Sequence, residues 1–421
     1  MRSPLAPVVE TIAPARLGRS FRWLLGSVTL TNIGDGVVLS AGPLLVASLT
    51  REPFLVSLAL LMEYLPMLLF ALIGGVAADR WNRKRMVVVA NLGRGLVLAV
   101  LVATIVSGTV TIAVILAALF VMGAAEIFSD SSSSTFIPNL VRREDLGIAN
   151  ARTQGAFLLM NQLVFPPVGA FLFALGPAIP FATDAICFFF GGLMITRVVV
   201  DWRSVRTAPS SVRHDLVEGI RWLAHHAPMR TLALTIFAFN VTYGAAWGVL
   251  VLYAQERLGM GEVGFGLLTT AMAVGGVIGT VSYTRLERRF SLADIMRVGL
   301  LIETFTHLSL ALTTSPIWAL GTMVVFGAHA FVWGTTSTVV RQRAVPDEVL
   351  GRVGGVYRMA IVGGIVIGTP IGGLLAQRFD SITAPFWFAF IGSALLVIVM
   401  WREFANIEHA GDVTPSAAPA V

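Results

Sequence analysis

A charged stretch decides the fold of this chain: Gly75-Val76-Ala77-Ala78-Asp79-Arg80-Trp81-Asn82-Arg83-Lys84-Arg85. The segments on either side of it are apolar. Each is long enough to cross a bilayer, because a helix needs about 20 apolar residues to span the hydrocarbon core. A short charged turn between two such segments is typical of a loop at the membrane surface. The stretch therefore predicts a membrane protein built from helices.

The composition extends this prediction to the whole chain. Of its 421 residues, 56% are hydrophobic and 13% charged, and the mean hydropathy is +0.80. Soluble proteins of this size are less apolar. Since the alternation of lipid-facing strands is absent, we expect an all-α integral membrane fold. Its twelve predicted transmembrane helices cover 22–47, 54–77, 86–107, 111–136, 147–175, 179–200, 230–253, 264–284, 294–313, 316–340, 350–377 and 382–402.

The basic residues lie in alternate loops. The net charge is +6, but of the 30 Lys and Arg residues only Arg51, Arg257 and Arg378 follow odd-numbered spans. The positive-inside rule then places both termini in the cytoplasm and the chain in the inner membrane. Nucleic-acid binding is disfavoured, because it requires the basic residues on one exposed surface.

The longest polar segment divides the chain into two parts. We expect a cytoplasmic linker at 201–229, with a short amphipathic helix from Asp215 to Leu223, between six-helix bundles at 21–200 and 230–403. The segments 1–20 and 404–421 are expected to be cytoplasmic tails.

A shift of 204 residues aligns the two parts with each other. It superposes Gly123-Ala124 on Gly327-Ala328, Glu144 on Glu348, Leu146-Gly147 on Leu350-Gly351, Pro166 on Pro370 and Gly169 on Gly373. Parallel repeats of this kind are typical of transporters whose site lies between two pseudo-symmetric bundles. Apolar glycine-rich helices can also align by composition alone.

The motifs of enzymes are missing from the sequence. There is no phosphate-binding Gly-x-x-x-x-Gly-Lys-Ser/Thr loop, no His-Glu-x-x-His and no Gly-x-Ser-x-Gly elbow. The lone Cys187 cannot form an intramolecular disulfide or a thiolate cluster. We therefore expect neither an enzyme nor a cofactor or metal, and energy for transport has to come from an ion gradient or a partner.

The charged stretch resembles the loop signature of the major facilitator superfamily, with Asp-Arg four residues after a glycine and a basic cluster behind it. Asn82 stands where many members have glycine. Other segments look like the branch that contains macrolide-efflux proteins and the enterobactin exporter: Asn32-Ile33-Gly34-Asp35, Leu65-Pro66, Val345-Pro346-Asp347-Glu348 and Gly351-Arg352-Val353. Phe165-Pro166-Pro167-Val168-Gly169-Ala170 is similar to the antiporter motif of drug exporters, although Phe165 and Ala170 replace two of its glycines.

The resemblance implies that the charged loop gates the cytoplasmic side. Asp79 could accept hydrogen bonds from the amino end of the span near Leu350 and Gly351, where the helix dipole is positive. The alternative is that the basic residues only fix the topology. The predicted gating loop comprises Gly75, Asp79, Arg80, Arg83, Lys84 and Arg85.

Ionisable residues inside the spans are candidates for proton coupling, because each costs about 2.5 to 3.5 kcal/mol on insertion scales. Asp35 is the strongest candidate, although it could equally be a structural acid bound to Arg94 or Asn32. Glu303 and His307, four residues apart, share a helix face and are either a relay or a structural pair. We expect His329 to line a cavity or to pack. The full set is Asp35, Glu63, Arg94, Glu126, Asp184, Glu303 and His307.

Polar and aromatic residues near the middle of spans one, five and seven are the predicted substrate contacts, or else helix packing: Asn32, Asn161, Gln162, Asn240, Tyr243 and Trp247. Together these features favour a monomeric, proton-coupled secondary transporter that exports a bulky amphipathic, drug- or macrolide-like molecule by alternating access. The alternatives are an exporter of a siderophore or lipid-like metabolite, and a membrane sensor or scaffold that transports nothing.

Overall fold

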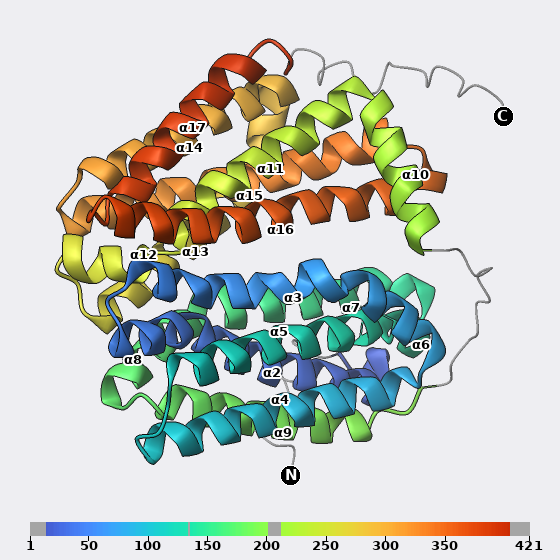
Figure 1. Cartoon of the computed structure of the whole chain (residues 1–421). Helices are drawn as coiled ribbons and strands as arrows, with labels where there is room; N and C mark the ends of the chain where they lie inside the picture. Colours follow the sequence, from blue (N-terminus) through green and yellow to red (C-terminus); the bar gives the residue numbers. More distant parts are fainter. Residues whose placement is uncertain (1–13, 134, 201–211, 405–421) are drawn as a thin grey trace. The chain divides into compact units, whose positions relative to one another are not determined.

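The computed structural model describes residues 14–133, 135–200 and 212–404, without the side chains of 72–80 and 212–213. All regular structure in these residues is helical (Figure 1). The chain separates into two compact units. The first comprises Met1–Thr50, Met62–Thr207 and Gly261–Thr270, and the second Arg51–Leu61, Ala208–Met260 and Ala271–Val421. We describe each unit by itself.

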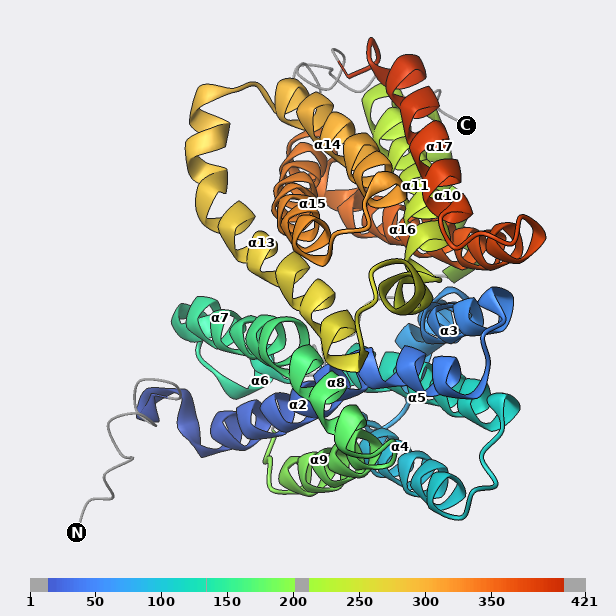
Figure 2. The ribbon, with the colours of Figure 1, turned by 90° about the vertical axis from the view of Figure 1, so that its left-hand side faces the viewer.

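The helices that precede the linker begin with a single short turn and end before residue 200. They are η1 (Ala15–Leu17), α2 (Gly18–Leu49), α3 (Pro53–Arg80), α4 (Arg83–Val106), α5 (Ile112–Ser133), α6 (Ile137–Leu140), η2 (Arg143–Asp145), α7 (Leu146–Ala156), the π-helical η3 (Phe157–Val164), α8 (Phe165–Leu175) and α9 (Ile179–Thr196). Within the first unit α9 packs against both α2 and α4 (Figure 2).

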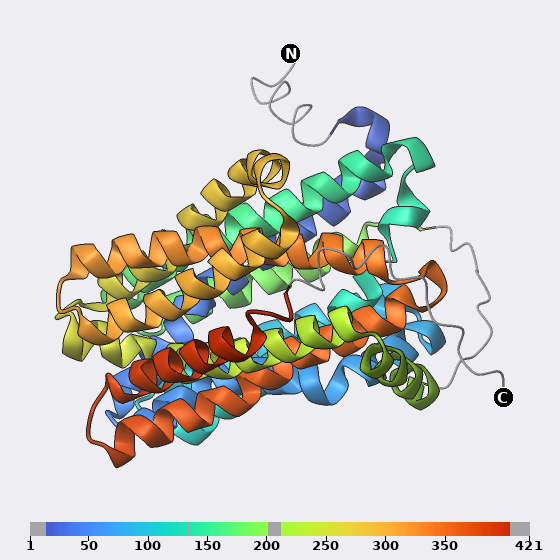
Figure 3. The same cartoon turned by 90° about the horizontal axis from the view of Figure 1, so that it is seen from above.

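The linker contributes one helix, and the others follow it. They are α10 (Val212–His225), α11 (Ala227–Trp247), α12 (Leu250–Leu252), the π-helical η4 (Tyr253–Arg257), α13 (Glu262–Arg289), α14 (Leu292–Leu312), α15 (Pro316–Ala344), α16 (Asp347–Arg378) and α17 (Ala384–Met400). Within the second unit α11 runs alongside α16 and α17 (Figure 3).

Ten helical segments of the described chain are long and apolar enough to cross a bilayer, or eleven if the bent pair at Ala227–Trp247 and Leu250–Arg257 forms one span. The remaining predicted span is α17, which is apolar but has only 17 residues. The helical membrane fold is therefore clear, while the count of twelve spans stays a prediction.

Two predicted spans depart from a regular α-helix. The helix predicted at 230–253 is broken after Trp247, and its two pieces are bent by 44°. The break falls at Gly248, which is a poor helix former and which lies against Thr369 of α16 so closely that a Cβ would be 3.0 Å from Cγ2. In the span predicted at 147–175, the π-helical η3 precedes Pro166 and Pro167, whose missing N–H groups cannot continue the α-helical ladder.

Glycines allow the closest helix crossings in both units. A Cβ on Gly169 of α8 would lie 2.0 Å from the carbonyl oxygen of Val37 on α2. A Cβ on Gly368 of α16 would lie 2.0 Å from the carbonyl oxygen of Val241 on α11. Backbones approach this closely in membrane helix pairs where the residue at the crossing is small.

Apolar side chains divide between the unit interiors and the surface. One buried cluster includes Phe21, Leu24 and Phe136. Large apolar residues also lie outward: Val89, Leu96 and Val106 on α4 are each at least two-thirds exposed. Long helices that contact lipid are expected to carry apolar side chains on their outer faces.

Candidate functional site: a buried charge cluster and an aromatic cavity

Arg94 of α4 is the centre of a charge cluster in the first unit. Its side chain is 5% exposed, and its Nη2 donates to Asp35 Oδ1 of α2 at 2.6 Å and lies 3.4 Å from Glu126 Oε2 of α5. The guanidinium carbon also stands 4.0 Å from the centre of the Phe188 ring. One cation thus binds two carboxylates inside the spans, where each charge needs a partner.

Asp184 of α9 lies beside this cluster. It is fully buried, and among the described residues neither of its carboxyl oxygens has a hydrogen-bond partner. Its Oδ1 packs against Gly34, the neighbour of Asp35, so tightly that a Cβ at position 34 would stand only 1.8 Å away. The buried Nε of Arg94 also lacks a partner in the described part of the chain. Unsatisfied buried polar groups are rare and mark functional sites or alternative states.

Glu63, the remaining acidic candidate of this unit, and Asp130, a neighbour of Glu126 on α5, are placed differently. Glu63 is partly buried on α3, and no described basic group lies within ion-pair distance of its carboxylate. Asp130 is exposed on α5, one turn beyond Glu126. The structure therefore brings Asp35, Arg94, Glu126 and Asp184 together, and gives Glu63 no ion pair within the described residues.

A second buried carboxylate lies in the second unit. Glu303 of α14 receives His307 Nε2 at 3.2 Å on Oε1, and His329 Nε2 of α15 at 3.0 Å on Oε2. Glu303 is 6% exposed and His307 is fully buried. The pairing with His307 follows the predicted spacing of four residues. His329 comes from another helix, so its role as a partner has no signal in sequence spacing.

An aromatic cavity of 220 Å³ borders this carboxylate. It is lined by Ile236, Phe239, Asn240, Tyr243, Met272, Glu303, Phe326, His329, Ala330 and Trp333. Trp247 is not in its wall but stacks on Tyr243, with ring centres 4.5 Å apart. Of the predicted contacts, the structure thus places Asn240 and Tyr243 at a cavity.

The other predicted substrate contacts are in the first unit and do not line this cavity. Asn32 donates its amide to the carbonyl of Val28 at 2.7 Å, within its own helix, and so does not bind Asp35. Asn161 and Gln162 bind each other within the π-helical η3. Wide π turns are frequent at functional sites.

The gating loop is described only in part, because the side chains of Gly75, Asp79 and Arg80 lie outside the described residues. Asn82 caps α4 by accepting the backbone N–H of Arg85 at 3.0 Å. Lys84 donates to the carbonyls of Thr196, the last residue of α9, and Val198 at 2.8 and 2.7 Å. The basic cluster therefore also ties two helices of the first unit together.

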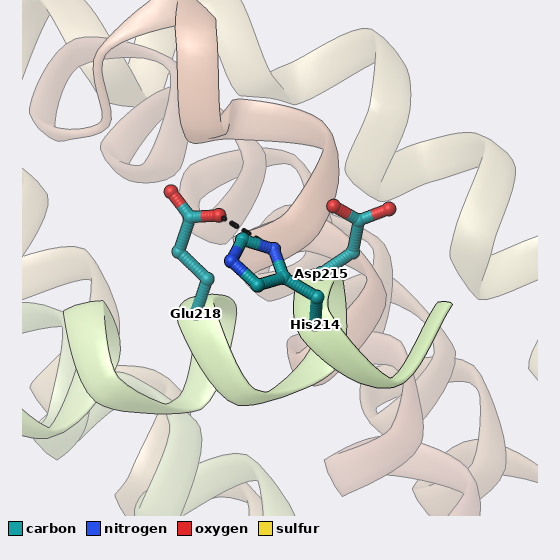
Figure 4. Close-up of side chains that lie close together, drawn as sticks. All are labelled: His214, Asp215 and Glu218. Atoms are coloured by element: carbon teal, nitrogen blue, oxygen red, sulfur yellow. Dashed lines mark ion pairs between the residues drawn. The ribbon is translucent and has the colours of Figure 1, made fainter. Parts of the chain in front are cut away.

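An ion cluster on the linker helix was not expected from the sequence. His214, Asp215 and Glu218 of α10 place three possible ligand atoms within 4.8 Å of one another (Figure 4). Arg352 of α16, however, already binds Asp215 at 2.9 Å and Glu218 at 2.8 Å. A guanidinium on both carboxylates opposes a metal ion there, so we interpret the cluster as a clamp between α10 and α16.

The sequence is similar to that of known exporters. The profile of a major facilitator family described as "Transmembrane secretion effector" matches residues 9–418. Similar proteins include the enterobactin exporter EntS of Shigella boydii serotype 4 and that of Escherichia coli O1:K1. Each is 26% identical over 410 residues, which cover 91% of this chain and 93% of the relative.

Solved structures with the same fold are membrane transporters. A bacterial homologue of the iron transporter ferroportin, in its inward-facing state, matches with a TM-score of 0.71 and 19% identity over 93% of this chain and 98% of its own. A mutant of the nucleoside transporter NupG matches with a TM-score of 0.73 and 11% identity over 92% of this chain and 100% of its own. At these identities the likeness concerns the fold alone.

Proposed function

This chain belongs to the transmembrane secretion effector family of the major facilitator superfamily, and we propose that it exports an amphipathic, siderophore-like small molecule. It is a multi-pass membrane transporter and not an enzyme, as the loop signature predicts. The similarity to enterobactin exporters over 91% of the chain supports a siderophore-type cargo. That alternative now fits better than the expected drug- or macrolide-like cargo.

We further propose that proton movement through the cluster around Arg94 drives export. The observation that carries this proposal is one buried guanidinium shared by Asp35 and Glu126, with the unpartnered Asp184 beside it. A carboxylate buried without a partner is costly, whereas a protonated or paired one is tolerated. The cluster therefore gathers three acids around one arginine, which binds two of them.

Proton binding would change the partner of Arg94. A proton on Asp35 removes the charge that holds Nη2 and frees the guanidinium for another acid. Asp184 and the Nε of Arg94 are both buried and unbonded within the described residues, so a pairing between them would satisfy both groups. Two alternative ion pairs on helices α2 and α9 form a bistable element that proton binding can shift.

We also propose that the chain has twelve spans with both termini in the cytoplasm. The segment from Gly75 to Arg85 would gate the cytoplasmic side. Residues Gly75 to Arg80 form the last turns of α3, Trp81 and Asn82 connect it to α4, and α4 carries Arg94. A movement of the loop would therefore be transmitted directly to the charge cluster.

Deleting the gene in its native host tests the cargo. We expect less siderophore in the medium and more in the cells under iron limitation, with recovery when the gene is restored. Unchanged secretion combined with increased sensitivity to macrolides would instead favour the drug-export interpretation. If the deletion changes neither siderophore secretion nor macrolide sensitivity, the result would support a sensor or scaffold.

Inverted membrane vesicles test the coupling. The siderophore collected from the host should accumulate in vesicles when a proton gradient is imposed, and should leave when an uncoupler collapses the gradient. Accumulation that persists with the uncoupler would contradict proton coupling.

A further inference from the structure

The aromatic cavity of the second unit has an unusual composition for its size. Four aromatic side chains, Phe239, Tyr243, Phe326 and Trp333, form much of its wall, and Glu303 reaches it from α14. Its 220 Å³ is below the roughly 300 to 1,000 Å³ of pockets that enclose drug-sized ligands. It can therefore hold one chemical group of a larger molecule.

The negative group of this cavity has no strong cation beside it. In the described part of the chain, the ion pairs of Glu303 are with His307 and His329 alone, and no arginine or lysine comes within ion-pair distance. Each histidine occupies one carboxylate oxygen. A carboxylate offers about four lone-pair sites, so acceptor capacity remains. The carboxylate is thus held in position without a permanent opposite charge.

The aromatic wall is itself organised. The rings of Tyr243 and Phe326 are nearly parallel, at 11°, with centres 6.1 Å apart. The rings of Phe239 and Trp333 cross at 67° with centres 5.8 Å apart. Aromatic rings attract cations through their electron-rich faces, most strongly where water is excluded.

We propose that this cavity binds an organic cation, a quaternary ammonium or alkylated amine, with Glu303 as its counter-charge and the four rings as its cage. An alkylated cation uses every property of the site, since its apolar shell packs on the rings while its charge faces the carboxylate. Under the proposed function, this group is part of the exported molecule. Binding itself can be measured without transport.

A metal ion fits the cavity less well. Glu303, His307 and His329 resemble a two-histidine, one-carboxylate set, but the histidines bind different oxygens of the carboxylate. Within the described residues, the only group that brings three possible ligand atoms within 4.8 Å of one another is the linker cluster with His214. Most of the remaining wall is aromatic or aliphatic and offers few of the ligands that a metal ion prefers.

The test compares two molecules of the same shape and different charge. Choline and its uncharged isostere 3,3-dimethyl-1-butanol are titrated by calorimetry into the full-length protein in lipid nanodiscs. We expect choline to bind about tenfold tighter or more, as a desolvated cation–π site predicts. Equal affinities, or no detectable choline binding at millimolar concentration, would overturn the proposal even before any variant is made.

Variants then locate the site. Glu303→Gln keeps the shape of the side chain and should reduce the preference for choline over the isostere several-fold, while the rings retain the remainder. Phe326→Leu should weaken choline more than the isostere. The matched control is Glu287→Gln, which neutralises an acid of α13 outside the cavity, where it pairs with Arg343 at 3.1 Å, and it should change neither affinity.

The two proposals can fail separately. A preference for choline that Glu303→Gln leaves as large as in the wild type would disprove this site. Loss of siderophore secretion in the gene deletion, together with equal binding of the two isosteres, would leave the export proposal standing and remove only the cation site.

Discussion

Arg94 Nη2 donates to Asp35 Oδ1 at 2.6 Å, and this bond joins α4 to α2 inside the first unit. Glu126 lies farther from the same nitrogen, at 3.4 Å, and its side chain is 48% exposed. The two acids therefore differ in their distance from the arginine and in the solvent exposure of their side chains. This difference makes them a matched pair for mutation.

Asp35→Asn removes the titratable group and keeps the size of the side chain. We expect this variant to lose uphill accumulation in inverted vesicles, down to the level of vesicles without the protein, because no proton can be carried at position 35. Exchange of labelled for unlabelled cargo should continue, since exchange needs no net proton movement. The half-exposed Glu126→Gln is the control and should keep most uphill transport. Normal accumulation by Asp35→Asn would refute the assignment.

Gly34→Ala tests the contact between α2 and α9. Its added Cβ would stand 1.8 Å from Asp184 Oδ1, so we expect a loss of about 1–3 kcal/mol from overpacking and a lower thermal unfolding temperature in detergent. Asp184→Ala in the same chain makes room and should restore part of the loss, as expected for residues in contact.

Gly93→Ala is the control for that substitution, because a Cβ added to this residue of α4 would meet no other atom within 4 Å. It should leave the unfolding temperature nearly unchanged. Equal effects of the two alanines would show that the contact with Asp184 is not the cause.

His226, between α10 and α11, predicts a dependence of stability on pH. Burial lowers the pKa of His226 below its ordinary value of 6.5. Its ring stacks on Trp222, and its Nδ1 caps α11 by accepting the N–H of Met229 at 3.4 Å. This cap needs an unprotonated Nδ1, so both the cap and the burial favour the neutral ring. The unfolded histidine binds its proton at higher pH, so the stabilisation is complete well above pH 6.5 and declines as the pH falls through 6.5 toward the lowered pKa.

Thermal unfolding between pH 8 and pH 5 measures this effect. His226→Asn keeps a side-chain cap but cannot titrate, so it should lose less stability than the wild type on acidification. His225→Asn, which changes the adjacent exposed histidine, should behave like the wild type. An identical pH profile for His226→Asn would exclude this histidine as the cause.

Arg352→Ala tests the clamp between the linker helix and α16. Because the three side chains are about one-quarter to one-third exposed, solvent screening limits the loss to about 0.5–1 kcal/mol. Amide hydrogen exchange of α10 should then be about two- to fivefold faster by the same estimate. Arg142→Ala breaks the much more exposed pair with Glu144 and should not affect α10. Unchanged exchange in Arg352→Ala would show that the apolar contacts of α10 hold it alone.

Local sequence patterns predict a large part of this molecule. The apolar windows give helices whose ends differ by a few residues: the span predicted at 86–107 is α4, Arg83–Val106. The spacing of Glu303 and His307 predicts a shared face, since residues four apart are neighbours on any α-helix. The break at Gly248 and the π-helical turns before Pro166 are harder to foresee, because glycine and proline occur in many spans that stay regular.

Taken by itself, the sequence determined that the chain crosses a membrane as helices and resembles the major facilitator proteins, because hydropathy and short motifs are properties of neighbouring residues. Only the tertiary structure decided that Asp184 meets Gly34, that His329 binds the second oxygen of Glu303 and that Arg352 holds the linker acids. These partners come from different helices. Which helix faces meet is set by the packing of side chains at helix crossings, and hydropathy contains no information about that packing.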